Sequence, residues 1–239
     1  MALPFFYTNT LQPGTNEFVL NEDTSKHVVQ VLRMQNGQQL NLTDGRGNIF
    51  TACITDDHKK RCTVSILSEN YQPPPEKIIT IAISPVKNTS RFEWFLEKAT
   101  EIGVNKIIPL ICSRTEKQHF RFDRMKSILI SAMLQSQQCW LPVLSEPVTF
   151  EDLVMRPFEH ENKCIAHCLP EGNKESLHIQ ISKSSNQLIL IGPEGDFTKE
   201  EIDLALKNDF IPVALGETRL RTETAGVVAE TLLCLAEPN

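Results

Sequence analysis

The stretch "QLILIGPEGDFTKEE", from Gln187 to Glu201, determines the fold class of the larger part of this chain. It begins as a short apolar run of strand type and passes through a loop with two glycines and a proline. It ends on the spacing of a helix capping box, Thr198 with Glu201. A buried strand followed at once by a capped helix is the repeating unit of α/β sheets, so the stretch predicts such a sheet if similar units flank it.

Similar units do flank it, because apolar strands and helices alternate from residue 78 onward. One helix is predicted from the capping box of Ser90 with Glu93 to Gly103, and another from about Asp123. Further buried strands are predicted in "IITIAIS" (78–84), "KIIPLIC" (106–112), "KCIAHC" (163–168) and "FIPVAL" (210–215). This alternation predicts a mostly parallel α/β sheet.

The first seventy residues follow a different pattern, with a period of two. "QQLNLTDGRGNIFTACI" (38–54) alternates apolar and polar residues around a turn that contains glycine, and "RCTVSIL" (61–67) continues the alternation. A small antiparallel β domain is therefore predicted over 1–72. Three consecutive prolines, Pro73 to Pro75, favour an extended linker over 73–77, which leaves 78–239 for the α/β domain.

Charge and hydropathy limit the classes of function. The formal net charge of -6 disfavours a protein that coats itself in nucleic acid, although a local basic face is compatible with that average. The sequence has no run of about 18 apolar residues and no secretion signal at its N-terminus. We therefore expect a cytoplasmic protein without a membrane span.

The seven cysteines are odd in number and irregularly spaced, which favours reduced thiols over a disulfide framework. The cluster "CIAHC" places Cys164, His167 and Cys168 close together, but no second pair of ligands stands nearby to complete a zinc site. We therefore expect a buried strand here and no metal.

Two unusual loops follow strands that are consecutive in the sequence: "GPEGDF" (192–197) and "LGETRLRTETAG" (215–226). Ligands of parallel α/β sheets bind at the carboxyl ends of the strands, and glycines there let backbone N–H groups face a ligand. Thr222 or Thr224 is suited to cap the helix that follows, with Glu223 in its first turn. Each loop alone is a common turn or cap; together they predict a pocket, and capping does not explain Arg219 and Arg221.

Five motifs carry a resemblance to a known family. They are "HVVQVLRMQNGQQLNLTDGRG", "FLEKATEIGV", the Arg-Thr pair after "PLICS", "GPEGDF" and "LGETRLRTETAG", in this order. The chain thereby resembles, over almost its whole length, the RsmE family of 16S ribosomal RNA (uracil-N3)-methyltransferases of the SPOUT superfamily. Periodicity alone would not predict the knotted topology of that superfamily, because knots are very rare.

The resemblance implies a fold, a cofactor and partners. The fold is a PUA-like β-barrel for RNA, followed by an α/β domain tied in a trefoil knot. The cofactor is S-adenosylmethionine, held by the knotted loops, and the substrate is a uridine of 16S ribosomal RNA in the small subunit. Family members are homodimers, and neither a metal nor a membrane is implied.

The family's motifs also imply site residues. Arg221 and Arg219 would hold a uracil carbonyl, and Glu223 is a possible proton acceptor, although capping its own helix is an equal alternative. His167 is included among the cofactor-binding residues because it stands at the end of the preceding strand. The alternative is that it is an ordinary core or surface histidine. The residues expected to frame the cofactor are His167, Gly192, Pro193, Glu194, Gly195, Leu215, Gly216, Leu220, Thr222, Thr224 and Ala225.

RNA contacts are implied at basic positions in both domains. The matching residues are His27, Arg33, Lys87, Arg91, Lys98 and Arg114. For each of them, the alternative interpretation is an ordinary solvated residue on the surface. The chain departs from the family's usual pattern at Leu134, Gln138, Thr218 and Arg219, which leaves the details of RNA docking open.

Two other functions remain possible on the sequence alone. One is a related SPOUT enzyme that methylates another RNA. The other is an RNA-binding protein whose α/β domain serves only for dimerisation or assembly, and failure to bind S-adenosylmethionine would favour it.

Overall fold

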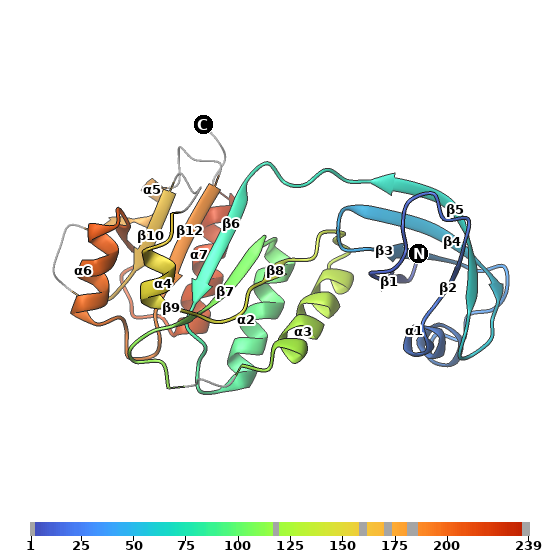
Figure 1. The fold of residues 1–239 in the computed structure, drawn as a ribbon, viewed down its shortest axis with the longest axis horizontal. Coiled ribbons are helices and arrows are strands. Elements are labelled where there is room, and N and C mark those ends of the chain that lie inside the picture. The colour runs from blue at the N-terminus through green and yellow to red at the C-terminus, as the bar shows by residue number, and fades with distance from the viewer. Residues whose placement is uncertain (1–2, 117–119, 158–161, 170–173, 181–185, 236–239) are drawn as a thin grey trace. The chain divides into compact units, whose positions relative to one another are not determined.

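The computed structural model describes residues 3–116, 120–157, 162–169, 174–180 and 186–235. The chain forms two compact units (Figure 1). The N-terminal unit comprises Met1–Pro74 together with Met133–Leu141, and the C-terminal unit comprises Pro75–Ala132 with Pro142–Asn239. No helix within the described ranges is long and apolar enough to cross a membrane.

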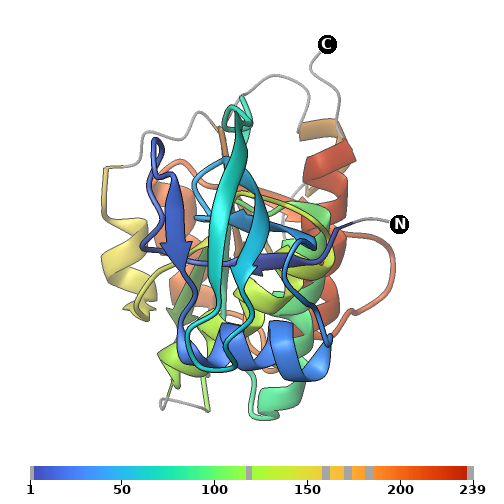
Figure 2. The same cartoon turned by 90° about the vertical axis from the view of Figure 1, so that its right-hand side faces the viewer.

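The N-terminal unit is built on a five-stranded sheet of order β1-β3-β4-β5-β2. Its strands are β1 (Phe5–Tyr7), β2 (Glu17–Val19), β3 (Gln39–Thr43), β4 (Asn48–Asp56) and β5 (Thr63–Tyr71), and the turquoise strand that faces the viewer in Figure 2 is β5. β3, β4, β5 and β2 pair antiparallel, as the alternating pattern predicts. β1 runs parallel to β3, so the sheet is mixed.

One face of this sheet is packed into a core. The buried side chains include Leu40, Leu42, Phe50, Ala52 and Ile54, which alternate along β3 and β4. A short helix α1 (Glu22–Lys26) is capped by the Asn21 side chain and continues into a π-helical segment η1 (His27–Val31). The expected small β domain is therefore present, and its two-residue period reflects one buried face. The prediction that it is antiparallel throughout is wrong, because β1 pairs parallel with β3.

The C-terminal unit contains an eight-stranded sheet in which the described pairings are all parallel. The order is β11-β13-β10-β12-β6-β7-β8, and β9 pairs with β7. The strands are β6 (Ile78–Ile83), β7 (Lys106–Ile111), β8 (Val143–Leu144), β9 (Val148–Thr149), β10 (Asn162–Ala166), β11 (Glu175–Ser176), β12 (Asn186–Ile191) and β13 (Ile211–Ala214). The predicted parallel α/β sheet is confirmed.

Helices cover both faces of this sheet, which explains why its central strands are apolar throughout. They are α2 (Thr89–Ile102), α3 (Phe122–Gln135), α4 (Phe150–Val154), α5 (Leu177–Gln180), α6 (Lys199–Lys207) and α7 (Thr222–Leu235). α4 and α6 pack on one face, where Phe150 and Ile202 join a core with Leu188 and Leu190 of β12. α2 and α7 pack together on the opposite face, behind the strands in Figure 1.

The helix starts test the predicted capping boxes. The box at Thr198 is present: its hydroxyl accepts from the Glu201 N–H at 3.2 Å, and the Glu201 carboxylate accepts from the Thr198 N–H at 2.8 Å. The box at Ser90 is wrong, because Asn88 caps α2 by accepting from the Ser90 N–H at 3.0 Å. Asparagine is at least as good a cap as serine, so the helix starts earlier than predicted.

Candidate active site

The loops predicted to hold a ligand meet at the carboxyl edge of the parallel sheet. β10 lies between β12 and β13, so the end of β10 separates the two glycine-containing loops. Together the three strand ends enclose a cavity of about 840 Å³, within the usual range for small-molecule sites. The two loops are thus neighbours through β10, not through direct pairing of their strands.

Most of the predicted site residues line this cavity. They are His167, Gly192, Pro193, Glu194, Gly195, Leu215, Gly216, Arg219, Leu220, Arg221, Thr222 and Ala225, together with Arg91 and Arg114. Glu223, Thr224 and Lys87 are not part of the lining, and His27 and Arg33 belong to the N-terminal unit. Sequence reasoning missed Cys168, Lys174 and Asp196, which also line it.

The first loop, residues 192–197, is held in a tight turn. The Asp196 N–H donates to the Pro193 carbonyl at 2.9 Å. A Cβ on Gly192 would lie 3.1 Å from the Phe197 ring, and one on Gly195 would lie 3.2 Å from the Arg114 Cδ. The Arg114 guanidinium donates to the Gly195 carbonyl at 2.6 Å. Both glycines therefore allow close packing of the turn, and the Arg114 guanidinium holds it by this bond.

The second loop, residues 215–221, leads into α7. Gly216 has a φ of 147°, and a Cβ there would meet nothing within 4 Å, so the backbone conformation and not space requires glycine. The predicted capping role of Thr222 is wrong, because the first helical bond runs from the Ala225 N–H to the Arg221 carbonyl at 2.7 Å. The Thr222 hydroxyl instead donates to the Gly192 carbonyl at 3.0 Å and ties the two loops together.

His167 lies at the end of β10, between the two loops, and only 8% of it is exposed. Burial lowers the pKa of its imidazole, and the Lys174 ammonium lowers it further, against an opposing effect of Asp196. Its Nδ1 has no hydrogen-bond partner among the residues that the structure describes. His167 is therefore a neutral imidazole at pH 7, at the cavity wall.

Asp196 and Lys174 hold the chain that follows His167. The Asp196 carboxylate accepts from the Cys168 N–H at 2.8 Å, and the Lys174 ammonium donates to the His167 carbonyl at 3.1 Å. No sequence motif marks Lys174. Asp196 could have been identified, because it follows directly on the glycine-containing turn.

Glu223 is buried at the start of α7 and faces Arg91. Its Oε1 lies 3.7 Å from the Arg91 Nε, and the same guanidinium lies 3.4 Å from the Glu194 carboxylate. The other Glu223 oxygen, Oε2, is buried and has no hydrogen-bond partner in the described part of the chain. Arg91, from the first turn of α2, thus connects α7 to the first loop.

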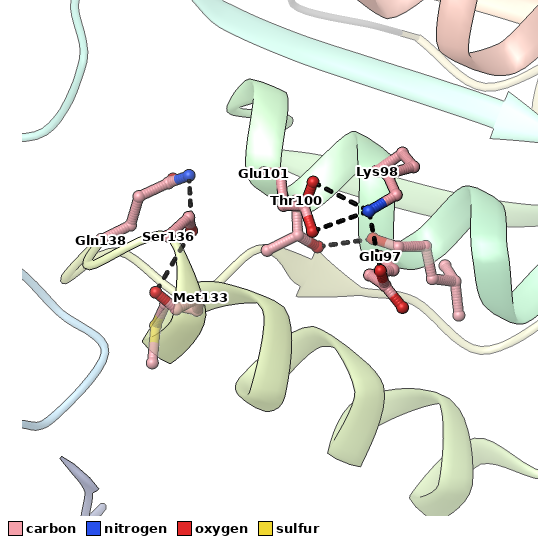
Figure 3. Close-up of polar contacts among 8 residues, drawn as sticks. Glu97, Lys98, Thr100, Glu101, Met133, Ser136 and Gln138 are labelled. Carbon is pink, nitrogen blue, oxygen red and sulfur yellow. Dashed lines mark hydrogen bonds and ion pairs between the residues drawn. The ribbon is translucent and has the colours of Figure 1, made fainter. Parts of the chain in front are cut away.

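The other basic residues predicted to contact RNA or the uracil differ in whether they are paired or exposed to solvent. Lys87 pairs with Glu116 at 3.0 Å, and Lys98 pairs with Glu97 and Glu101 at 2.8 and 3.0 Å along α2 (Figure 3). Arg219 and Arg221 are exposed at the cavity. In the N-terminal unit, His27 is exposed with its ring edge against Phe6 at 5.7 Å, and Arg33 is exposed with a φ of 56°.

No group of three or more His, Cys, Asp or Glu side chains is arranged to hold a metal ion in the described part of the chain. All seven cysteines are free thiols. Besides apolar side chains, the lining of the cavity includes glycine-containing backbone, a neutral histidine, carboxylates, a lysine and arginines. Such a lining suits a polar organic ligand with an anionic or carbonyl-bearing reactant beside it.

Known proteins share this fold and these motifs. A family model described as an RNA methyltransferase domain matches residues 73–234, and one described as an RNA methyltransferase PUA domain matches residues 20–67. A ribosomal RNA small subunit methyltransferase E from Rickettsia conorii is 28% identical over 228 residues, which is 93% of this chain and 91% of the relative.

Solved structures of similar proteins also match this chain over nearly its whole length. A probable rRNA-methyltransferase from Porphyromonas gingivalis has a TM-score of 0.88 at 38% identity, covering 95% of each chain. A putative methyltransferase from Legionella pneumophila, in complex with the bound cofactor SAM, has a TM-score of 0.86 at 30% identity and covers 98% of this chain and 97% of its own. Since the methyltransferase match extends over more than half of the chain, the chain belongs to the RNA methyltransferase family that includes the ribosomal RNA small subunit methyltransferase E proteins.

Proposed function

We propose that this protein transfers a methyl group from S-adenosylmethionine to N3 of a uridine in 16S ribosomal RNA within the small subunit. The observation that carries the proposal is the cavity itself. Two glycine-containing loops and a neutral histidine enclose it, and two exposed arginines stand at it, in a chain of the RNA methyltransferase family. The Rickettsia relative is named for ribosomal RNA of the small subunit, and the Legionella structure holds SAM.

The residues present fit this cofactor. A cavity of about 840 Å³ has room for a nucleoside with an amino-acid tail, and Gly192, Gly195 and Gly216 line it without side chains of their own. The lowered pKa of His167 keeps its imidazole uncharged, so it adds no repulsion to a cationic sulfonium. When bound, the cofactor supplies the electrophilic methyl group, and the loops hold it in position.

The arginines are assigned to the uracil. Loss of the N3 proton to solvent water leaves negative charge on the uracil oxygens, and a guanidinium that stays charged stabilises it through hydrogen bonds. Arg221 and Arg219 are exposed at the cavity and are available for this contact. Glu223 is less suited to accept the proton, since it does not line the cavity and its carboxylate faces Arg91. We assign it instead to the positioning of Arg91.

The target uridine must be unpaired or flipped out of its helix. N3 forms a hydrogen bond inside a paired duplex, so a methyl group can reach it only after the base leaves that pairing. A folded subunit that presents such a base is therefore the expected substrate. His27 and Arg33, exposed in the N-terminal unit, are proposed contacts to its RNA.

A homodimer is also proposed. Support comes from the family resemblance. Light scattering of the purified protein that gives the mass of a single chain at micromolar concentration would contradict a dimer.

The function is tested by mapping 3-methyluridine in 16S ribosomal RNA by mass spectrometry. The map is made in a strain without this protein, and again after isolated small subunits receive the protein and S-adenosylmethionine. Loss and restoration of one 3-methyluridine would establish the reaction. A missing mark in another RNA would assign a related methyltransferase activity, and no missing mark anywhere, with no binding of S-adenosylmethionine, would favour the non-catalytic alternative.

A further inference from the structure

Aromatic side chains gather at one place on the N-terminal unit. The chain has only two tyrosines and two tryptophans. Both tyrosines and one tryptophan surround the loop that carries Arg46, although they are far apart in the sequence. The rings of Tyr71 and Trp140 lie edge to face with centroids 6.3 Å apart, and a Cβ on Gly45 would lie 3.0 Å from the Tyr7 ring.

The loop between β3 and β4 is rigid and holds Arg46 outward. The Asp44 carboxylate accepts from the backbone N–H of Arg46 at 2.8 Å and from the Asn48 side chain at 2.6 Å. Gly45 and Gly47 have φ values of 71° and 92°, which favour glycine. Arg46 is exposed, and its guanidinium forms no ion pair with a described residue. The loop backbone that carries the cation is thus held in one conformation, and the guanidinium is accessible to a ligand.

Trp140 is held against this loop by its own backbone. The Gly47 N–H donates to the Cys139 carbonyl at 3.0 Å, and the Leu141 N–H donates to the Gly45 carbonyl at 2.9 Å. The Trp140 indole N–H donates to the Gln72 carbonyl at 3.0 Å. The indole therefore has its polar group satisfied and remains half-exposed beside Tyr71, which is 55% exposed.

We propose that Tyr71, Trp140 and Arg46 form a binding surface for unpaired nucleotides of the RNA substrate. Bases stack on the two rings, and the Arg46 guanidinium contacts a phosphate. The inference rests on the proposed function, because it assumes that RNA is the substrate. Preformed aromatic rings beside an arginine are the usual means of binding single-stranded nucleic acid.

The low positive charge of this surface predicts which kind of interaction supplies the affinity for RNA. The chain has a net charge of -6, and one arginine stands at this surface, so stacking and not phosphate neutralisation must supply most of the affinity. Binding should therefore depend only weakly on salt, with a logarithmic slope of about 1. A paired duplex offers no free base face to the rings, so it should bind poorly.

The test uses Trp140 fluorescence in the full-length protein. Trp94, on α2 in the C-terminal unit, is first changed to phenylalanine so that Trp140 is the single reporter. Titration with a short single-stranded oligouridine should quench Trp140, whereas a duplex of the same length should not. Tyr71→Ala should weaken binding about tenfold or more, and Tyr71→Phe should leave it unchanged, since phenylalanine keeps the ring.

Arg46→Gln should weaken binding and remove most of the salt dependence. Leu67→Ala is the matched control: Leu67 lies on the same strand, is 53% exposed, and should have no effect. Equal weakening by Tyr71→Ala and Leu67→Ala, or quenching that the Tyr71 and Arg46 variants leave unchanged, would overturn the inference. So would quenching by ribosomal proteins but not by RNA.

Failure of this inference differs from failure of the proposed function. If methylation of small subunits is normal in Tyr71→Ala and Arg46→Gln and oligouridine binding is unaffected, only this surface is wrong. If oligouridine binds as expected but no RNA is methylated, the surface stands and the methyltransferase assignment fails.

Discussion

Glu230→Gln should abolish a pH dependence of stability that arises from one buried carboxyl group. Glu230, in α7, is completely buried, and its Oε2 has no hydrogen-bond partner within the described ranges. Its Oε1 accepts from the Cys234 thiol at 3.2 Å. Burial raises the pKa of Glu230 from 4.5 to about 8, against smaller opposing effects of Cys234 and Lys77.

The direction of the effect follows from proton binding. Because the folded pKa lies above the unfolded one, the folded chain holds a proton between these values that the unfolded chain has lost. The contribution to stability is complete below pH 4.5 and is lost as pH rises to about 8. The shift corresponds to about 5 kcal/mol of unfolding free energy, at about 1.4 kcal/mol per pKa unit.

The assay is urea unfolding, followed by tryptophan fluorescence, at several pH values between about 5 and 8. The wild-type protein should lose several kcal/mol of stability across this range relative to Glu230→Gln, because glutamine has the same shape and does not ionise. Glu151→Gln, at an exposed position of α4, is the matched control and should follow the wild type. Parallel curves for wild type and Glu230→Gln would refute the reasoning.

Three other substitutions test the site and the packing. Arg221→Ala should lower the methylation rate by about 10²–10³-fold, as loss of one oxyanion-binding donor does. Calorimetry should show that the variant binds S-adenosylmethionine within a few-fold of the wild-type affinity. Full methylation of ribosomal RNA by the variant would contradict this role. Thr222→Val removes the bond to Gly192 and should cost about 1–3 kcal/mol in thermal unfolding, together with weaker cofactor binding. Gly47→Ala should destabilise the N-terminal unit by more than about 3 kcal/mol in chemical denaturation, because its Cβ would lie 2.5 Å from a backbone oxygen; an unchanged midpoint would exclude this packing.

Short-range sequence patterns predicted the strands β3 and β4 and the start of α6. The two-residue period of β3 and β4 and the capping box at Thr198 are short-range signals, and the structure contains both. The error at Ser90 is also local: Asn88 and Ser90 are both good caps, and the sequence contains no signal that ranks them. Such signals locate a helix more reliably than they locate its first residue.

The candidate site was only partly predictable. Glycine, proline and the arginines of the two loops could be identified, because their residue types have few other uses at strand ends. The roles of Thr222 and Glu223 could not, since each depends on a partner at least thirty residues away in the sequence. The Thr222 hydroxyl contacts Gly192, and the Glu223 carboxylate faces Arg91.

Sequence by itself thus determined the longer strands and helices, the parallel sheet and the residue types at its strand ends, because these follow from periodicity and local conformational preference. It did not predict the short elements β1, β2, α1, η1, β8, β9, α4, β11 and α5. Only the tertiary structure decided that β10 lies between β12 and β13 and so brings His167 to the cavity. It also decided that Met133–Leu141 packs with the N-terminal unit and sets Trp140 beside Tyr71. Strand order and long-range packing arise from the burial of whole faces, which no short window of sequence encodes.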